Sequence, residues 1–304
     1  MGNGVLSYNK LVIRTKKLVE KCDVPEHWSK TKNEKFDVHT ICILFVLFQI
    51  EQKDYRLFSG WLSITTALGL KDVPHFTTLQ KAFARLPPKL MRRLVQLSGR
   101  CRDKVQSLDP TYYQLSSPSI GYCRRINRDP RRDLTRKVTV VVAKNSKKVA
   151  DVFVRAKERH GMKDIPYIAT SGCFKGKTTL ADKEFDAEKF HQIIEDHGGK
   201  SIVPLKYADV PIHRTTGVHR KNLKRKGIPK IFRFRVISES NNSSVKRRFS
   251  PVLRGKKFWQ QARDLYGKYL THNLSLDCFL KFIRTFYRAL SNIYDVVKVY
   301  KTSA

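Results

Sequence analysis

The chain has 304 residues, of which 41% are hydrophobic, so it is long enough for two domains and a sizeable core and we expect a globular protein. Its 61 Lys and Arg against 26 Asp and Glu give a formal net charge of +35. A surplus of this size favours a polyanionic partner, above all nucleic acid, because each neutralised phosphate releases counterions.

The cysteines and the apolar runs indicate the cellular compartment of the protein. Six cysteines are scattered without any C-x-x-C pair, which is typical of reduced thiols rather than a zinc site. The one strong apolar run, Ile41 to Ile50, is too short to span a bilayer. We therefore expect a soluble protein of the cytoplasm, associated with the nucleoid and with no membrane partner.

The first 100 residues have helical patterns. An amphipathic stretch runs from Leu11 to Lys21, and Asp37 is an N-cap candidate for a buried helix that ends near Gln49. Thr77 or Thr78 can cap a further helix that stops before Pro87-Pro88. Short helices of this kind form either a helix-turn-helix-like module or a bundle that only packs on the rest. We assign residues 1–100 as an all-helical DNA-binding region.

From about residue 104 the pattern becomes that of strands. Val105 to Asp109 alternates, and Pro110 predicts that this strand ends at Asp109, because proline cannot continue a central ladder. The following elements are a hairpin of Lys137 to Ala143 and Val149 to Arg155, a strand from Thr178 to Ala181, a helix from Ala187 to His197, and a strand from Ser201 to Leu205. This order predicts an α/β core.

Two later segments complete the chain. Residues 206–230 hold two Pro, two Gly and many cations, and Asp209 is their only acid, so we expect an exposed basic loop, either a linker or a DNA contact. The run over 276–300 has apolar residues at helical spacing and predicts a C-terminal helix for packing or dimerisation.

Three acids stand where an α/β core can bring them together. Asp109 and Asp182 each follow or end a predicted strand, and Glu239 is the only acid between Val210 and Gln261. Neighbouring carboxylates repel unless a divalent cation neutralises them, and oxygen ligands suit Mg²⁺ or Mn²⁺. We expect two ions about 3.5 to 4 Å apart, one activating the nucleophile and one stabilising the leaving oxygen. Asp186 is expected to cap the next helix instead.

The surroundings of Glu239 form an array. On an α-helix, Phe232, Arg235, Glu239 and Lys246 share one stripe about 60° wide. Helix propensity is poor here, because Ile231 to Ile237 alternates like a strand and Asn241-Asn242-Ser243-Ser244 disfavours helix. The array therefore needs tertiary packing to form.

These motifs carry a family resemblance. Asp109 in Asp-x-Thr, Asp182 in Asp-Lys-x-aromatic-Asp, and Glu239 in aromatic-x2-Arg-x3-Glu-x6-Lys resemble the three motifs of DDE transposases from prokaryotic insertion sequences. The similar branch has the signature Y-(2)-R-(3)-E-(6)-K, whose two later spacings are matched here. The resemblance covers roughly residues 50 to 300. The chain departs from the family at Phe232, which replaces Tyr, and at Glu184, where Gly is frequent.

The resemblance implies a ribonuclease-H-like catalytic domain over residues 101–304. Asp109, Asp182 and Glu239 would be the catalytic residues and the ligands of two Mg²⁺ or Mn²⁺ ions. Arg235 and Lys246 would bind transposon-end DNA, and Phe232, in the place of the family's Tyr, would stack on a base or sugar.

The implied activity is that of an enzyme, a metal-dependent DNA transposase. It would hydrolyse the phosphodiester at terminal inverted repeats and join the freed 3′-hydroxyl to target double-stranded DNA, as a homodimer that pairs two ends. Two alternatives remain at this stage: a decayed or domesticated DNA-binding protein without catalysis, favoured by Phe232 and Glu184, and a related nuclease that cuts without rejoining.

Overall fold

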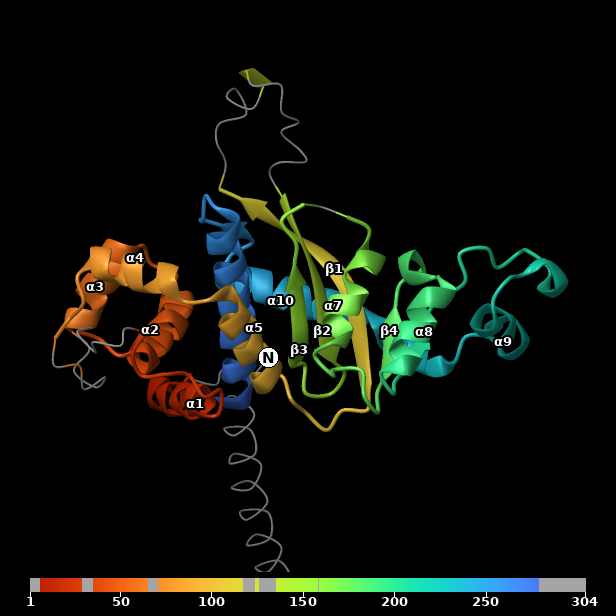
Figure 1. Cartoon of the computed structure of the whole chain (residues 1–304), viewed down its shortest axis with the longest axis horizontal. Coiled ribbons are helices and arrows are strands. Elements are labelled where there is room, and N and C mark those ends of the chain that lie inside the picture. Colours follow the sequence, from red (N-terminus) through yellow and green to blue (C-terminus); the bar gives the residue numbers. More distant parts are fainter. Residues whose placement is uncertain are drawn as a thin grey trace, which may run out of the picture.

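A computed structural model describes residues 6–28, 35–64, 70, 72–116, 124–125, 135–157 and 159–278 of the chain. Its architecture is mixed α/β, with a mixed sheet and helices on both faces (Figure 1). The predicted helix over 276–300 lies almost wholly outside the described residues, of which the last, 258–278, form one helix. Among the described residues, no helix is both long enough and apolar enough to cross a membrane.

The N-terminal part is helical, as predicted. Its helices are α1 (Tyr8–Glu20), α2 (Val38–Glu51), α3 (Tyr55–Ser63), α4 (Phe76–Arg85) and α5 (Pro88–Ser98). Asp37 caps α2 by accepting a hydrogen bond from the Thr40 N–H at 2.7 Å, which confirms that prediction.

The predicted cap of α4 is wrong. The helix begins at Phe76 and follows His75, so Thr77 and Thr78 lie inside its first turn. The Thr77 hydroxyl is 2.9 Å from Nδ1 of His75, so it bonds to that ring and not to a backbone N–H of the helix. The Pro87-Pro88 pair does end the helical run, and Pro88 then starts α5, where its missing N–H costs nothing.

The sheet has the strand order β3-β2-β1-β4-β5, and β6 pairs with the end of β1. Its strands are β1 (Val105–Leu115), β2 (Thr135–Ala143), β3 (Val149–Val154), β4 (Thr178–Ala181), β5 (Lys200–Ile202) and β6 (Val252–Leu253). The pairs β1–β2 and β2–β3 are antiparallel, whereas β1–β4, β4–β5 and β1–β6 are parallel. The predicted hairpin and the strand from Thr178 to Ala181 are thereby confirmed, and the strand predicted over Ser201 to Leu205 forms as Lys200–Ile202.

Pro110 does not end β1, contrary to the prediction, and the strand continues to Leu115. The Gln114 N–H donates to Pro251 on the β6 side, and Lys144 donates to the Val105 carbonyl from the β2 side. Because backbone groups alternate along a strand, Pro110 turns its nitrogen to the same side as Gln114. There β4 pairs only up to Leu108 and β6 starts only at Gln114, so no ladder bond requires the missing N–H.

The second half of the chain adds helices around the sheet. They are α7 (Ile165–Ala169), α8 (Glu188–Asp196), α9 (Val218–Lys226) and α10 (Val236–Phe249), with single-turn 3-10 helices η2 (Gly161–Lys163), η3 (Lys183–Phe185) and η4 (Ile212–Arg214) and the longer η5 (Lys230–Arg235). The predicted loop over 206–230 therefore contains a helix, α9, which follows Gly217 at φ +92° and ends at Gly227 at φ +72°.

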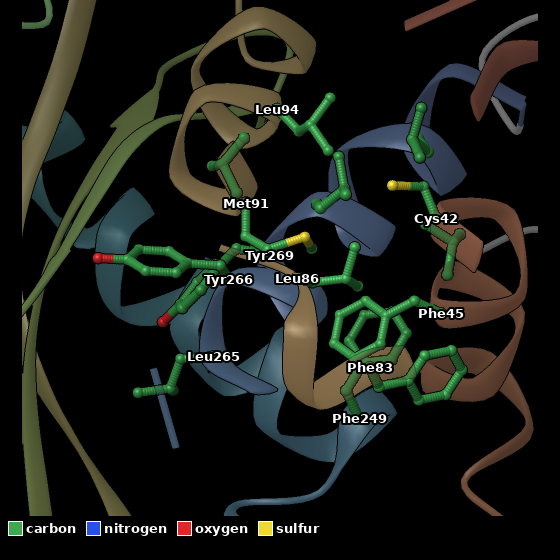
Figure 2. Close-up of a cluster of buried hydrophobic side chains, with 14 of the residues drawn as sticks. Cys42, Phe45, Phe83, Leu86, Met91, Leu94, Phe249, Leu265, Tyr266 and Tyr269 are labelled. Atoms are coloured by element: carbon green, nitrogen blue, oxygen red, sulfur yellow. The ribbon is translucent and has the colours of Figure 1, made fainter. Parts of the chain in front are cut away.

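Two hydrophobic clusters cover the two faces of the sheet. One contains Leu108 and Val141 with side chains of α7 and α8. The other contains Val138, Val140 and Tyr113 with side chains of α10, the helix 258–278 and the N-terminal helices. Figure 2 shows this second cluster, where Phe45 and Phe83 meet the core formed by Leu265, Tyr266 and Tyr269. The N-terminal helices thus share one core with the sheet.

Close approach joins the two halves. A Cβ added at Gly267, in the helix 258–278, would lie 2.6 Å from Phe45 of α2, so only glycine permits this packing. On the sheet side, the Arg92 guanidinium of α5 donates to both carboxylate oxygens of the fully buried Asp151 of β3, at 3.0 and 2.6 Å. These contacts fix the helical region against the sheet.

Candidate functional site

The register of β1 and β4 places two of the predicted acids side by side. Leu108 pairs with Ala181 at the end of the parallel ladder, so the next residues on the two strands are Asp109 and Asp182. Side chains at matching positions of neighbouring strands point to the same face. That face is the one to which Ser107 and Tyr113 point, opposite to the face of Leu108.

Helix α10 lies on this face and carries the third acid in its first turn. The Ser107 hydroxyl of β1 lies 2.9 Å from the Arg235 carbonyl and 2.9 Å from the Ser238 hydroxyl. Ser238 is buried against the strand, whereas Glu239, the next residue, is exposed. The serine pair therefore anchors the start of α10 beside Asp109.

Packing overrides the poor helix propensity of α10. Buried Asn241 bonds through Oδ1 to Nε2 of His272 at 3.0 Å, and buried Asn242 accepts from the Tyr269 hydroxyl at 3.3 Å. Both partners belong to the helix 258–278. The Asn-Asn-Ser-Ser segment is thus helical because its amides bond to a neighbouring helix, and Val245 completes the buried side.

The predicted stripe is divided between two kinds of helix. Phe232 and Arg235 lie in the 3-10 helix η5, and Glu239 and Lys246 lie in α10, so a single α-helix over 232–246 is wrong. Phe232 is half-buried, and its backbone N–H donates to the Pro229 carbonyl at 2.9 Å. The neighbouring Phe234, which sequence reasoning missed, has the Lys144 ammonium 3.6 Å from its ring centroid.

Arg235 and Glu239 form an ion pair with each other. The Arg235 Nη2 is 2.7 Å from Glu239 Oε1 across one helical turn, and the side chains are 22% and 50% exposed. Glu239 is therefore held by a cation and still faces solvent. A metal ion at Glu239 or a phosphate at Arg235 would therefore compete with this ion pair.

Asp109 has an unusual electrostatic environment. Burial raises the pKa of its carboxyl to about 6, and Arg235 opposes that rise, while the charges of Glu239, Asp182 and Glu184 add to it. Glu239, Asp182 and Glu184 therefore each act on Asp109 through space. A site that disfavours the ionised carboxylate in this way is one that a cation would stabilise.

Lys246 lies near the same site from the other end of α10. Its ammonium is 5.3 Å from the centroid of the buried Tyr113 ring. Burial lowers the pKa of Lys246, and the negative charge of Asp109 opposes this change. Lys246 therefore contributes positive potential next to Asp109, and its contact with DNA stays a prediction.

The second motif, residues 182–186, makes contacts that the sequence did not predict. Asp182 accepts a hydrogen bond from the Lys183 N–H at 2.6 Å, and Glu184 accepts from the Lys137 ammonium and the Gly161 N–H at 3.4 and 3.3 Å. Glu184 is thus bound to β2 and to η2. The strand pattern marks Lys137 only as a residue of the hairpin, so its pairing with Glu184 had no sequence signal.

Asp186 does not cap α8, contrary to the prediction. The residue before the helix is Ala187, and no side chain caps it. Asp186 instead accepts from the Lys206 N–H and from Nε of Arg220, both at 2.8 Å. It therefore connects the second motif to α9.

The donor set suits a hard divalent cation in its chemistry. Asp109, Asp182 and Glu239 offer only carboxylate oxygens, which are the ligands that Mg²⁺ and Mn²⁺ prefer. The two aspartates are adjacent, but Glu239 is bound to Arg235. Across the described ranges, no three His, Cys, Asp or Glu side chains converge closely enough to hold a metal ion.

Comparison with known proteins places the chain in no family. No protein-family model matches it, and no curated protein matches it. Among solved structures it is similar to a chain of the cryo-EM structure of a simian T-cell lymphotropic virus intasome in complex with the PP2A regulatory subunit B56 gamma. The TM-score is 0.27 and the identity 11%, over 68% of this chain and 63% of that chain, which is less than two thirds of the latter.

Proposed function

We propose that the chain is a metal-dependent DNA transposase, which cleaves DNA at transposon ends and joins them to target DNA. The observation that carries the proposal is the β1–β4 register, which makes Asp109 and Asp182 neighbours on the face where α10 presents Glu239. The raised pKa of Asp109 supports it, because the charges of the other two acids contribute to that rise.

The proposal includes a ribonuclease-H-like core for residues 101–304. An antiparallel β1-β2-β3 meander followed by parallel β4 and β5, with a helix carrying the last acid over β1, supports that fold. In this proposal the helices of residues 1–100 form the DNA-binding region, although they share a hydrophobic core with the sheet.

The proposed ligands are Asp109, Asp182 and Glu239, for one or two Mg²⁺ or Mn²⁺ ions. When bound, such ions activate a water or a 3′-hydroxyl and stabilise the leaving oxygen of an in-line displacement. The two aspartates are already adjacent, and Glu239 joins them after its ion pair with Arg235 opens. Above pH 6 Asp109 is ionised and can act as a ligand.

Binding of DNA would open the ion pair between Arg235 and Glu239. A phosphate group competes with Glu239 for the Arg235 guanidinium, because guanidinium groups bind phosphate in bidentate geometry. Lys246 and Phe232 would contact the same strand, as the resemblance to the Y-(2)-R-(3)-E-(6)-K branch implies. The net charge of +35 supports tight binding of duplex DNA, both the terminal inverted repeats and the target.

A DNA-binding protein without catalysis is the second candidate. The Arg235–Glu239 ion pair favours it, because it neutralises the third acid in the structure. A related nuclease that cuts without rejoining is the third, and only its product distinguishes it from a transposase.

The test uses DNA carrying the inverted repeats that flank the reading frame. We expect cleavage and strand transfer with Mg²⁺ or Mn²⁺, and loss of both in Asp109→Asn, Asp182→Asn and Glu239→Gln, while DNA binding is kept. Asp196→Asn, an exposed carboxylate on α8, is the matched control and should remain active. Unchanged cleavage in any of the three variants would contradict the proposal.

The same experiment separates the candidates. A wild-type protein that binds the repeats tightly but cuts them with neither metal is the non-catalytic DNA-binding protein. Cleavage without a joined product in the presence of target DNA indicates the nuclease.

A further inference from the structure

A cleft that none of the three predicted acids lines lies between the N-terminal helices and residues 254–264. Its volume is about 560 Å³, within the range of small-molecule sites. One wall comes from α2, α4 and the start of α3, and the other from the helix 258–278 and the segment that leads into it. Its lining includes the side chains of Phe48, Tyr55, Asp264, Arg254, Lys257 and Arg263.

We call this cleft the helical cleft. One of its walls is aromatic. The rings of Phe48 and Tyr55 are stacked at 4.9 Å with 17° between their planes, and both side chains are half-buried. Behind them Phe45 and Phe83 are buried, and Figure 2 shows these two rings in contact between α2 and α4. The two rings cover each other's facing sides, so the outer face of the stack is the flat surface on which a planar base can stack.

A single carboxylate supplies hydrogen-bond acceptors in the same cleft. Asp264 accepts from the Gln49 amide at 3.1 Å and lies 3.6 Å from the Lys268 ammonium, and its side chain is 22% exposed. An ionised carboxylate has about four lone-pair sites, so these two partners leave acceptor capacity free. The Lys268 ammonium is engaged elsewhere too, because it donates to the backbone carbonyls of Ser250 and Val252.

This acceptor discriminates among the bases. The Watson–Crick edge of guanine presents two adjacent donors, N1–H and the N2 amino group, to a carboxylate. The same edges of adenine and cytosine present one amino donor beside an acceptor nitrogen, which a carboxylate repels. Thymine presents one N–H between two carbonyls. Asp264 therefore favours guanine.

The rim of the helical cleft is positive. Arg254, Lys256, Lys257 and Arg263 line it, against Asp54 and Asp264. Lys256 and Lys257 are exposed and form no ion pair with any carboxylate in the part of the chain that the structure describes. Two such cations next to an aromatic wall suit a phosphate attached to a stacked nucleoside.

We propose that the helical cleft binds one guanine nucleotide, with its base on the Phe48–Tyr55 wall, its Watson–Crick edge on Asp264, and its phosphate on Lys256 and Lys257. The site is separate from Asp109 and Asp182 and needs no divalent metal. It goes beyond the proposed transposition and does not depend on it.

The test is calorimetric titration of the full chain with dGMP, dAMP, dCMP and dTMP in the absence of divalent metal. We expect saturable one-to-one binding of dGMP, about tenfold or more tighter than dCMP, which is the usual discrimination of a bidentate contact. No saturable binding, or equal affinity for the four nucleotides, would overturn the proposal.

Two variants test the assigned contacts. Asp264→Asn should lose the preference for guanine, because its amide offers one acceptor and one donor. Lys256→Gln/Lys257→Gln should weaken dGMP several-fold and leave guanosine unchanged. Lys189→Gln/Lys200→Gln removes the same charge from exposed positions of α8 and β5 and should bind dGMP like the wild type. If both cleft variants bind dGMP like the wild type, the assignment is wrong.

Asp264 contacts a buried lysine, so Asp264→Asn is checked by thermal denaturation, and the exposed lysine pair keeps the test valid if that variant does not fold. A second titration compares the pentanucleotide TTGTT with TTTTT. A guanine preference of the helical cleft predicts tighter binding of TTGTT than of TTTTT, and equal binding of the two contradicts it. Binding of TTGTT without saturable binding of free dGMP also overturns the proposal. Asp109→Asn should bind dGMP like the wild type, which separates this outcome from that of the cleavage assay.

Discussion

Replacing Asp109 with Asn should stabilise the protein at neutral pH while it removes the proposed activity. Burial is the main cause that raises the pKa of the Asp109 carboxyl; Arg235 opposes it, and the charges of Glu239, Asp182 and Glu184 add to it. The folded state therefore disfavours the ionised carboxylate, and a neutral amide of the same shape removes that cost. Sites that carry function are often destabilising in this way.

The magnitude follows from the pKa of Asp109. Its rise from 3.8 to about 6 corresponds to about 3 kcal/mol at 1.36 kcal/mol for each pKa unit. Because the side chain is only partly buried, solvent screening reduces this to about 1 to 2 kcal/mol. For a chain of this size we expect a rise in Tm of roughly 1.5 to 3 °C at pH 7.5.

The difference in stability between Asp109→Asn and the wild type depends on pH. Between pH 3.8 and about 6 the folded state keeps a proton that the unfolded chain has released, so folding loses stability as the pH rises through this window. At pH 4.5 the wild-type carboxyl is protonated in the folded state, and Asn should then give little advantage.

Thermal denaturation followed by circular dichroism at pH 4.5, 6.0 and 7.5 measures this difference. Taking the difference between variant and wild type at each pH cancels the titration of all groups that do not interact with Asp109. Asp196→Asn, on the surface of α8, should have the Tm of the wild type throughout. A Tm for Asp109→Asn that is lower than the wild type at pH 7.5, or a gain that does not change with pH, would refute the reasoning.

Three further outcomes are expected. Arg92→Leu leaves the fully buried Asp151 carboxylate without its cation, so urea denaturation should show a loss of about 3 to 5 kcal/mol, and a smaller loss than 1 kcal/mol would contradict the role of this pair. Burial lowers the pKa of His272 to about 4, so the wild type should lose stability as the pH falls from 6.5 to 4. His272→Gln should flatten this dependence, and an unchanged slope of stability against pH in the variant would contradict this role of His272. Arg225→Gln/Lys226→Gln on α9 should reduce the slope of log K against log salt for duplex DNA by up to about 2, and an unchanged slope would exclude α9 from the contact.

The sheet could be predicted because its signals are local. The Val-rich hairpin and the strand Thr178–Ala181 have β-branched residues between polar turns, and both form as expected. Asp37 is an N-cap because its side chain reaches a backbone N–H three residues later, which the sequence alone determines. Interactions over a few residues are visible in one sequence.

The incorrect predictions concern segments whose conformation depends on residues far away in the sequence. Pro110 fits inside β1 because β4 and β6 leave a gap beside it, and no local signal reveals where those strands start and stop. The polar residues of α10 form a helix because Tyr269 and His272 bond to them from another helix. The single α-helical stripe through Phe232 is wrong for a related reason, because the chain enters α10 through a 3-10 helix.

The first turn of α10 connects the fold to the proposed chemistry. Ser107 anchors this turn on β1, so the position of Glu239 beside Asp109 follows from the strand itself. Its charge, however, is balanced by Arg235, and this pair keeps the total negative charge near Asp109 lower than three free carboxylates would give. A DNA phosphate that takes Arg235 therefore leaves an uncompensated Glu239 next to two aspartates. In the proposed transposase, the demand for a divalent cation would then rise when the scissile strand binds, so metal and DNA should bind with positive cooperativity.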